Sequence, residues 1–296
     1  LLQLQTHFHV LIGGRRSIKE ISMSTFYNSE RLKYNQMNYN NDVELDNFCS
    51  QCLLVINAVG PSFKINDKIA LHALRNNCHY IDIGGYGILR DLLKPYEKSI
   101  EAQKLCFIIG VGWMPGISGV FSKTIIETHL NSPENTNFNI YYGAVDNWSY
   151  SSTYDLAASS MGKTRSYVYS HGKEIQVSPF RYTHHKFFPF IGHKKICMPS
   201  FDEQLTQLAT SLKQIRKIST FIMLNDYISM GKFMFIKIFY KHNLNKATLM
   251  LQDDYQRLVK KENKWGSVIC QVSKIEPERK IDTLSLIHIS EPTRHL

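Results

Sequence analysis

Short apolar runs alternate with segments of helical spacing through the first part of the chain. Three of these runs end in small residues: Leu53–Pro61, His79–Gly85 and Cys106–Gly119. Asn57, Ile83 and Gly110 lie near the ends of the three runs and are 26 and 27 positions apart. That spacing is close to the length of about 30 residues of a strand-helix-strand unit. The pattern predicts a parallel sheet whose carboxyl ends line up, and such ends form the ligand crevice of open α/β sheets.

The segments between the runs are predicted to be helices. Apolar residues recur at helical spacing in Ile65–Asn76 and again in Ile88–Gln103. Upstream, Phe8–Ile12 predicts a further strand, followed by a helix that starts at Ile18. Residues 24–52 are mostly polar, and there we expect one short strand near Val43. Strands that alternate with helices predict a doubly wound α/β sheet.

A second domain is predicted after Gly119, where the pattern changes. A helix over residues 120–130 leads into the turn-rich segment 131–137, and Ser170–Lys173 is predicted to turn a β-hairpin. The predicted strands cover residues 138–145, 165–169, 174–177, 194–198 and 266–273, and the predicted helices cover 153–161, 201–212 and 226–240. We therefore expect two domains, residues 1–130 and 131–283, the second an α+β domain with a mainly antiparallel sheet.

The two ends of the sequence are unusual. The first residue is Leu1 and not methionine. At the other end, Leu284–Arg294 looks like the in-frame translation of a common sequencing-library adapter. We expect residues 284–296 to be an artefact and set them apart from both domains.

Composition and charge narrow the class of protein. The apolar fraction is 43%, and no apolar run reaches the length of about 18 residues that marks a transmembrane helix. No secretory signal is visible and the six cysteines are scattered, which predicts a cytoplasmic protein. The formal net charge of +10 would suit an anionic ligand, a nucleic acid or a membrane surface. Because the basic residues are spread out, we expect no nucleic-acid partner.

The turn after the first predicted strand carries two arginines. Gly14, Arg15, Arg16 and Ser17 stand where many dinucleotide enzymes have an acidic residue for the ribose 2′-hydroxyl of NAD. A guanidinium at this place pairs with the 2′-phosphate of NADP in a bidentate fork. The residues therefore favour NADP over NAD. The alternative is a surface turn with two solvated arginines, and only the neighbouring sheet pattern favours the cofactor over it.

Two segments of small residues are further candidates for binding. They are Asn57, Ala58, Val59, Gly60 and Pro61 in the first segment, and Gly112, Trp113, Met114, Pro115 and Gly116 in the second. The first lets a ligand approach the backbone closely, although a tight strand-to-helix connection needs the same residues. The second continues neither a strand nor a helix, so its amides can face a ligand. A structural loop is the alternative there, and the tryptophan favours a flat apolar face for an aromatic ring.

Asp82 is a single carboxylate among apolar neighbours near the end of the second run. In a cleft it would accept a proton or orient a cofactor hydroxyl, and it is our candidate catalytic residue. An aspartate at such a place more often caps a helix or anchors a turn, and we favour that interpretation. Cys49 and Cys52 have the spacing of half a metal site, but no second pair follows. We expect core thiols and no metal.

The order of these motifs resembles one known family. VINAVGP (residues 55–61), HYIDIGG (79–85), GVGWMPGISG (110–119) and YSHGKEIQVSPF (169–180) follow one another as in the saccharopine dehydrogenase-like oxidoreductases. The likeness covers about residues 8–215. It implies a Rossmann domain that binds NADP, a second domain for a small-molecule substrate and for homodimerisation, and hydride transfer to or from the nicotinamide.

The resemblance also implies a role for each motif. Gly14–Ser17 would hold the adenosine 2′-phosphate, Asn57–Pro61 would line the path from adenine to ribose, and Gly112–Gly116 would border the nicotinamide. Arg165 or Arg181 would clamp a substrate carboxylate, although either fits an exposed surface arginine better. The family acts on secondary amines of amino acids and on lipid-like substrates, so membership does not fix the substrate. The alternative function is a non-catalytic NADP-binding sensor or interaction protein.

The sequence departs from the family pattern in two places. The opening Gly-x-Gly-x-x-Gly turn, which holds the pyrophosphate at a helix N-terminus, is absent, and Leu1–Gln5 is expected to be the end of the helix that follows it. We therefore expect this chain to bind the cofactor weakly. Met114 stands where the family often has an acidic residue. A chain without its first strand would also expose unpaired strand edges, and cooperative unfolding tests whether it folds.

Overall fold

The computed structural model describes residues 8–22, 30–84, 87–129, 136–161, 167–171, 173–189, 191–200, 203–211, 215–240, 242–275 and 280–289. The predicted end of a helix at Leu1–Gln5 lies outside these residues. The chain divides into two units, the first formed by Leu1–Val59 and Lys64–Val111, and the second by Gly60–Phe63 and Gly112–Leu296. The division therefore falls at Val111 and not near residue 130, because the helix that follows the Gly112–Gly116 loop packs within the second unit.

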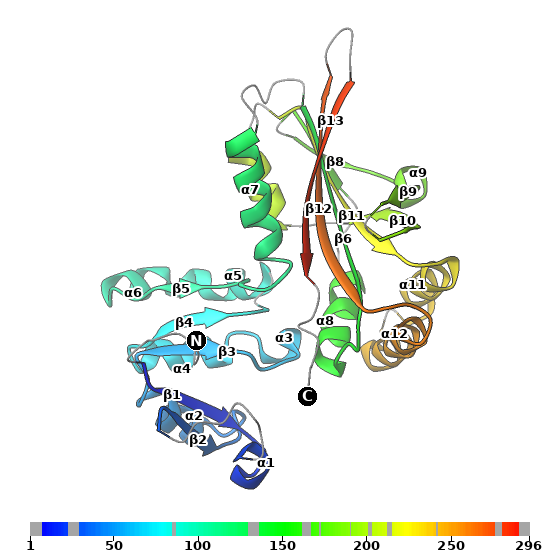
Figure 1. Ribbon diagram of the computed structural model, residues 1–296. Coiled ribbons are helices and arrows are strands. Elements are labelled where there is room, and N and C mark those ends of the chain that lie inside the picture. The colour runs from blue at the N-terminus through cyan, green and yellow to red at the C-terminus, as the bar shows by residue number, and fades with distance from the viewer. Residues whose placement is uncertain are drawn as a thin grey trace. The chain divides into compact units, whose positions relative to one another are not determined.

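Parallel strands form the sheets of the first unit (Figure 1). Strand β1 (Val10–Gly14) pairs with β2 (Leu32–Gln36), and β3 (Leu54–Asn57), β4 (His79–Asp82) and β5 (Phe107–Ile108) form a second sheet in that order. The carboxyl ends of β3 and β4 are in register, with Asn57 opposite Asp82. The predicted parallel α/β arrangement is confirmed.

Helices connect these strands and cover one face of the three-stranded sheet. They are α1 (Ile18–Ser22), α2 (Asp42–Cys49), α3 (Ser62–Ile65), α4 (Lys68–Arg75), α5 (Gly87–Leu93) and α6 (Glu97–Ala102), with a 3₁₀ turn at Lys94–Tyr96. Val55 and Tyr80 of the sheet share one core with Leu45 of α2 and with Ile69 and Ala73 of α4. Burial of this alternating set of strand residues fixes the register of the strands.

Three local predictions in the first unit were wrong in detail. Val43 lies in helix α2 and not in a strand, because the Asn41 side chain caps that helix by accepting the backbone N–H groups of Val43 and Glu44. The single helix expected over residues 65–76 breaks at Asn66, whose φ of 53° is left-handed. The helix expected over residues 88–103 is divided by a 3₁₀ turn that contains Pro95, which cannot donate a helical hydrogen bond.

The second unit contains an eight-stranded sheet (Figure 1). Its strands are β6 (Thr136–Val145), β7 (Tyr167–Ser170), β8 (Lys173–Gln176), β9 (His184–Phe188), β10 (His193–Pro199), β11 (Lys217–Leu224), β12 (Trp265–Ile275) and β13 (Lys280–Ile289). The main order is β13-β12-β6-β11-β10-β9, and β7 and β8 form the predicted hairpin beside β11. Among the described strands of this sheet only β6 and β11 pair in parallel, so the predicted mainly antiparallel sheet is confirmed.

The helices of the second unit are α7 (Ile117–His129), α8 (Tyr150–Met161), α9 (Pro179–Tyr182), α10 (Glu203–Ser211), α11 (Tyr227–Phe239) and α12 (Leu244–Val259). Strand β11 and helix α12 were not predicted from the sequence. Residues 284–296 were expected to lie outside both domains, whereas residues 284–289 belong to β13, which pairs with β12. None of the described helices is long and apolar enough to cross a membrane.

Candidate functional site

The carboxyl ends of β3 and β4 hold a buried polar triad of Asn57, Tyr80 and Asp82. These residues are 5%, 0% and 3% exposed. Tyr80 precedes Asp82 by two positions, which places both side chains on one face of the sheet. Nδ2 of Asn57 donates to Oδ2 of Asp82 at 2.7 Å, and the Tyr80 hydroxyl donates to the same oxygen at 2.5 Å. The Asp82 carboxylate is thus paired with two buried donors, Tyr80 from its own strand and Asn57 from the neighbouring strand.

This triad fixes the backbone where the strands end. Burial, together with the charge of Asp82 and the hydrogen bond to it, raises the pKa of Tyr80 far above its usual range, so the hydroxyl keeps its proton. Oδ1 of Asn57 accepts the N–H of Val59 at 3.0 Å, and the backbone oxygen of Asp82 accepts the N–H of Val111 at 3.0 Å. This geometry favours the anchoring interpretation of Asp82, and its catalytic assignment stays a prediction.

The segment that ends at Pro61 leads into helix α3, whose first amides are already bonded. The carboxylate of Asp155 in α8 accepts the N–H of Ser62 at 2.9 Å and of Phe63 at 3.2 Å. A carboxylate at this place satisfies amides that the helix itself leaves free. A Cβ on Gly60 would lie 2.8 Å from Cβ of Ser151, so glycine permits the approach of α8. These contacts account for the small residues structurally, and their role in lining a cofactor stays a prediction.

The turn after β1 presents Arg15 and Arg16 at the surface. Their backbone oxygens accept hydrogen bonds from β2, at 3.3 Å from Nε2 of Gln36 and at 2.7 Å from the hydroxyl of Tyr34. The backbone of the turn is therefore held in place. In the part of the chain that the structure describes, no hydrogen bond or ion pair engages either guanidinium. The predicted phosphate-binding arginines are exposed side chains on a fixed backbone.

Ser17, the last residue of this predicted site, also has a structural role. The carboxylate of Glu20 accepts its backbone N–H at 2.8 Å and its hydroxyl at 3.1 Å. This is the glutamate half of a capping box at the start of α1, and the N–H of Glu20 donates to the backbone oxygen of Ser17 at 3.1 Å. A phosphate that binds Ser17 would compete with Glu20 for these donors, so Arg15 and Arg16 are the stronger part of the candidate site.

The Gly112–Gly116 loop is closed on itself and faces the core of the second unit. The N–H of Gly112 donates to the backbone oxygen of Pro115 at 3.1 Å, and the N–H of Gly116 donates to Oε1 of Gln204 in α10 at 2.8 Å. Gly116 has φ 128°, a conformation that glycine adopts without strain. The indole of Trp113 packs against the core, and its buried Nε1 has no partner among the described residues. These contacts support a structural role for the loop, and its place beside a nicotinamide stays a prediction.

The remaining candidates from the sequence are the two substrate-binding arginines and the cysteines. Arg181 is exposed on α9, and Arg165 lies outside the described residues. Sγ of Cys78 donates to the backbone oxygens of Cys49 and Cys52 at 3.2 and 3.1 Å, and burial raises the pKa of Cys49 to about 12. These are unreactive core thiols, as the sequence predicts. Among the described residues, no group of three or more His, Cys, Asp and Glu side chains could hold a metal ion.

Three partners of the candidate motifs were not singled out from the sequence: Tyr80, Asp155 and Gln204. The period of two along a strand could have pointed to Tyr80, since it places the side chain on the face of Asp82. Asp155 and Gln204 are 93 and 88 positions away from the amides that they bind. No local pattern in the sequence indicates contacts of that kind.

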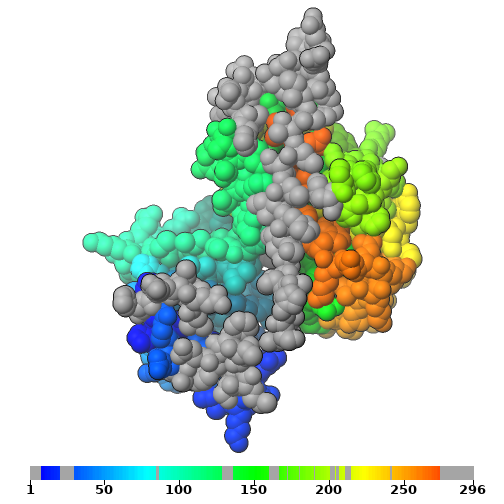
Figure 2. Space-filling model, viewed as in Figure 1, coloured from blue at the N-terminus to red at the C-terminus, as the bar shows by residue number. Residues whose placement is uncertain are grey.

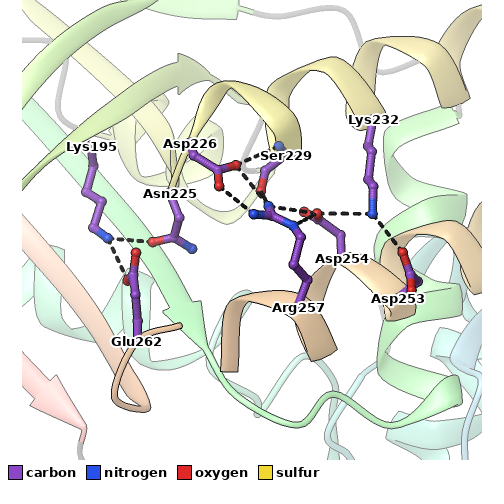
Figure 3. Close-up of polar contacts among 9 residues, drawn as sticks. All are labelled: Lys195, Asn225, Asp226, Ser229, Lys232, Asp253, Asp254, Arg257 and Glu262. Carbon is purple, nitrogen blue, oxygen red and sulfur yellow. Dashed lines mark hydrogen bonds and ion pairs between the residues drawn. The ribbon is translucent and has the colours of Figure 1, made fainter. Parts of the chain in front are cut away.

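A second polar cluster, in the second unit, holds α11 and α12 together (Figure 3). The guanidinium of Arg257 makes a bidentate pair with Asp226 at 2.7 and 3.0 Å and reaches Asp254 at 2.9 Å. Nearby, Nζ of the buried Lys195 contacts Asn225 at 2.6 Å and Glu262 at 3.0 Å. Every charged group shown has an opposite charge beside it, so we interpret the cluster as structural.

Acid should weaken this cluster at Asp226. Burial alone would raise the pKa of Asp226, but hydrogen bonds from Arg257 and Ser229 outweigh it and lower the pKa to about 2. A depressed pKa adds stability above the unfolded value of about 3.9, and this stability is lost as the pH falls towards 2. Since the side chain is a third exposed, we expect a contribution of only about 1 to 2 kcal/mol.

The replacement Asp226→Asn tests this expectation, because asparagine also caps helices and only the charge is lost. Urea midpoints of the variant and the natural chain should differ most at pH 6, and the difference should shrink as the pH falls from about 4 towards 2. Asp91→Asn, at an exposed position, should give equal midpoints at both pH values. A difference for Asp226→Asn that does not change with pH would contradict the assignment.

Comparison with known proteins bears on the fold. No protein-family model and no curated protein sequence matches the chain. The chain is similar to the solved structure of saccharopine dehydrogenase (L-Glu forming) from Saccharomyces cerevisiae, with a TM-score of 0.61 and 14% identity over 95% of this chain and 80% of that chain. At this identity the likeness establishes the fold.

Two other solved structures match more loosely. An engineered D-amino acid dehydrogenase bound to NADP⁺ has a TM-score of 0.40 and 7% identity, covering 95% of this chain and 83% of that chain. A dehydrogenase from Clostridium difficile has a TM-score of 0.36 and 10% identity, covering 97% and 84%. The fold shared with saccharopine dehydrogenase confirms the predicted Rossmann-like fold class with a second α+β region, in line with the resemblance of the motifs.

Proposed function

We propose that this protein is an NAD(P)-dependent oxidoreductase that transfers hydride between NADP(H) and a small substrate. The observation that carries the proposal is the pair of exposed guanidinium groups at the carboxyl end of β1, in a fold shared with a dehydrogenase. The carboxyl ends of parallel strands are where open α/β sheets bind ligands. The substrate that we favour is an amino-acid derivative oxidised or reduced at a C–N bond.

The residues of the turn after β1 fit the 2′-phosphate of NADP. Two guanidinium groups offer several N–H donors, and hydrogen bonds from β2 fix the backbone that carries them. The carboxylate of Glu20 binds Ser17 at the end of the turn, so a phosphate is expected at the two guanidinium groups and away from Ser17. When bound, the nicotinamide supplies the hydride. Asp82 acts as a positioning residue that holds Asn57 and the strand ends.

Removal of the two arginines should abolish the preference for the 2′-phosphate. We expect 2′,5′-ADP to bind the chain more tightly than 5′-ADP, and Arg15→Ala and Arg16→Ala each to weaken 2′,5′-ADP by about tenfold, the effect of losing one charged hydrogen bond. Titration calorimetry or NMR measures both affinities. This probe carries the 2′-phosphate without the nicotinamide half of the cofactor.

A matched control separates a site from general attraction to a basic protein. Lys33→Ala removes an exposed charge from β2 in the same unit and should leave the affinity for 2′,5′-ADP unchanged. Equal binding of 2′,5′-ADP and 5′-ADP by the natural chain would overturn the NADP assignment.

Turnover separates the enzyme from the alternative of a cofactor sensor. NADPH oxidation by the full-length protein without residues 284–296 should be measured against a panel of imines and enoyl thioesters. Imine-dependent oxidation would support the oxidoreductase and the C–N substrate. Tight NADPH binding without turnover across the whole panel would favour the sensor.

A further inference from the structure

Helix α11 is apolar on two opposite faces. Its buried face, which includes Ile236, packs in the core of the second unit. On the other face Ile228, Phe235, Ile238 and Phe239 are 51%, 39%, 65% and 65% exposed. Atoms of this yellow segment lie on the surface in the space-filling view (Figure 2). A surface helix normally turns a polar face outward, so this one has the character of a covered helix.

The exposed face has the spacing of a helix-helix seam. Ile228, Gly231, Phe235 and Ile238 follow at intervals of three, four and three positions, the a and d pattern of a coiled coil. We call these four residues the seam. Gly231 is unfavourable inside a helix, and a Cβ there would have nothing within 4 Å. Packing within the chain does not require this glycine, which leaves a hole in the seam.

We propose that two copies of this chain associate through α11, antiparallel across a two-fold axis near Phe233. In that register Phe235 of the second copy lies over the hole at Gly231, and Ile228 lies opposite Ile238 of the second copy. Each contact occurs twice, once from the first copy to the second and once from the second to the first, as a symmetric interface requires. The resemblance to a family implies homodimerisation in general, whereas the seam gives it a surface and a register.

The charges around the seam fit this pairing. None of the four seam residues is charged. Nζ of Lys232 is turned towards α12, at 2.8 Å from Asp253 and 3.3 Å from Asp254, and Nζ of Lys237 lies 5.7 Å from the centre of the Phe233 ring. In the antiparallel register neither lysine faces a lysine of the other helix. The repulsion expected between two chains of charge +10 is therefore kept away from the contact.

The area available is at the lower limit for a specific pair. An aromatic side chain buries about 150–250 Å² when it is covered completely. Ile228, Phe235, Ile238 and Phe239, with Tyr227 at the helix start, are on average about half exposed. Together they offer on the order of 500 Å² per copy, or about 1,000 Å² for the pair, which reaches the lower limit of specific interfaces.

The variant Gly231→Leu tests the hole. The natural chain should sediment with twice the 34.3 kDa mass of one copy. Leucine makes the face more apolar and the helix more favourable, yet it fills the space that Phe235 of the second copy needs. We expect the dissociation constant to rise about 10- to 100-fold, the range for overpacking a filled contact. Equal or tighter association of Gly231→Leu would overturn the proposed register.

Two further variants test the surface and its direction. Ile238→Asp should give a monomer that still unfolds cooperatively, whereas Val43→Asp, at an equally exposed site in α2, should remain dimeric. In a Cys106→Ser background, oxidation should link two copies of the double variant Ile228→Cys with Ile238→Cys. Each single cysteine variant should stay unlinked. A link formed by Ile238→Cys alone would show parallel helices and contradict the antiparallel pair.

Other occupants of the face predict different results. If the face binds lipid, the natural chain should be monomeric and should co-sediment with vesicles of phosphatidylcholine and phosphatidylserine, and Gly231→Leu should increase that binding. Association through the seam would be rejected if the natural chain is a monomer. It would also be rejected if the natural chain binds vesicles and Ile238→Asp loses that binding. These readouts do not depend on the proposed cofactor.

Discussion

Replacement of Glu262 by alanine is expected to destabilise the second unit by about 3 to 5 kcal/mol, the cost of leaving a buried charge unpaired. Lys195 is 1% exposed, and its ammonium depends on Glu262 at 3.0 Å and Asn225 at 2.6 Å, with the Trp265 ring 5.0 Å away. Without the carboxylate, the ammonium keeps one neutral acceptor and an aromatic face. Neither compensates for the loss of its hydration.

The reverse replacement, Lys195→Met, should cost much less, about 1 kcal/mol or below, because an apolar side chain of similar length then fills the buried space. Glu262 is 28% exposed and can turn to water once its partner is gone. Tryptophan fluorescence during urea unfolding measures both variants, since the three tryptophans, Trp113, Trp148 and Trp265, all lie in the second unit. Similar losses for Glu262→Ala and Lys195→Met would show that Lys195 is not a buried cation in need of a partner.

The strand ends show how far the sequence predicts this fold. Three apolar runs at nearly equal spacing predicted a parallel sheet, and Asn57 and Asp82 do lie side by side at its carboxyl end. The hairpin at Ser170–Lys173 was predicted from its turn residues, because turns depend on local backbone preferences. Strand β11 was missed because it is buried almost throughout, so it lacks the alternation of a half-exposed strand.

The chemistry of the candidate site was less predictable, because it depends on contacts between distant residues. The Asp155 side chain accepts hydrogen bonds from the amides that follow Pro61, and the Gln204 side chain accepts one from the amide of Gly116. Both side chains come from helices far along the sequence. Backbone amides that the sequence suggests are free to bind a ligand are thus in part already hydrogen-bonded within the protein. Only the Arg15–Arg16 turn keeps exposed charges, since its stabilising bonds are made by the backbone.

Replacement of Asp82 by alanine is expected to destabilise the first unit by about 3 kcal/mol. The change removes the acceptor of two buried donors, the Tyr80 hydroxyl at 2.5 Å and Nδ2 of Asn57 at 2.7 Å. A buried donor without a partner costs about 1 to 3 kcal/mol, and bonds to a charged group lie at the upper end. The Asn57 amide keeps a contact with the Tyr80 oxygen at 3.1 Å, which limits the loss.

Amide hydrogen exchange is the appropriate measurement, because the first unit contains no tryptophan. Protection of the β3 and β4 amides should fall in Asp82→Ala. In Tyr80→Phe the free energy of protection should fall by about 1 to 2 kcal/mol, and in Asp91→Ala, an exposed control, protection should stay unchanged. A catalytic Asp82 predicts another pattern, with lost turnover, an altered pH profile and full protection in Asp82→Asn. If Asp82 is an anchor, its replacement lowers the protection of β3 and β4, and activity falls only because the strand ends move. Full protection in Asp82→Ala would therefore reject the anchoring role of Asp82 and leave the catalytic role as its remaining assignment.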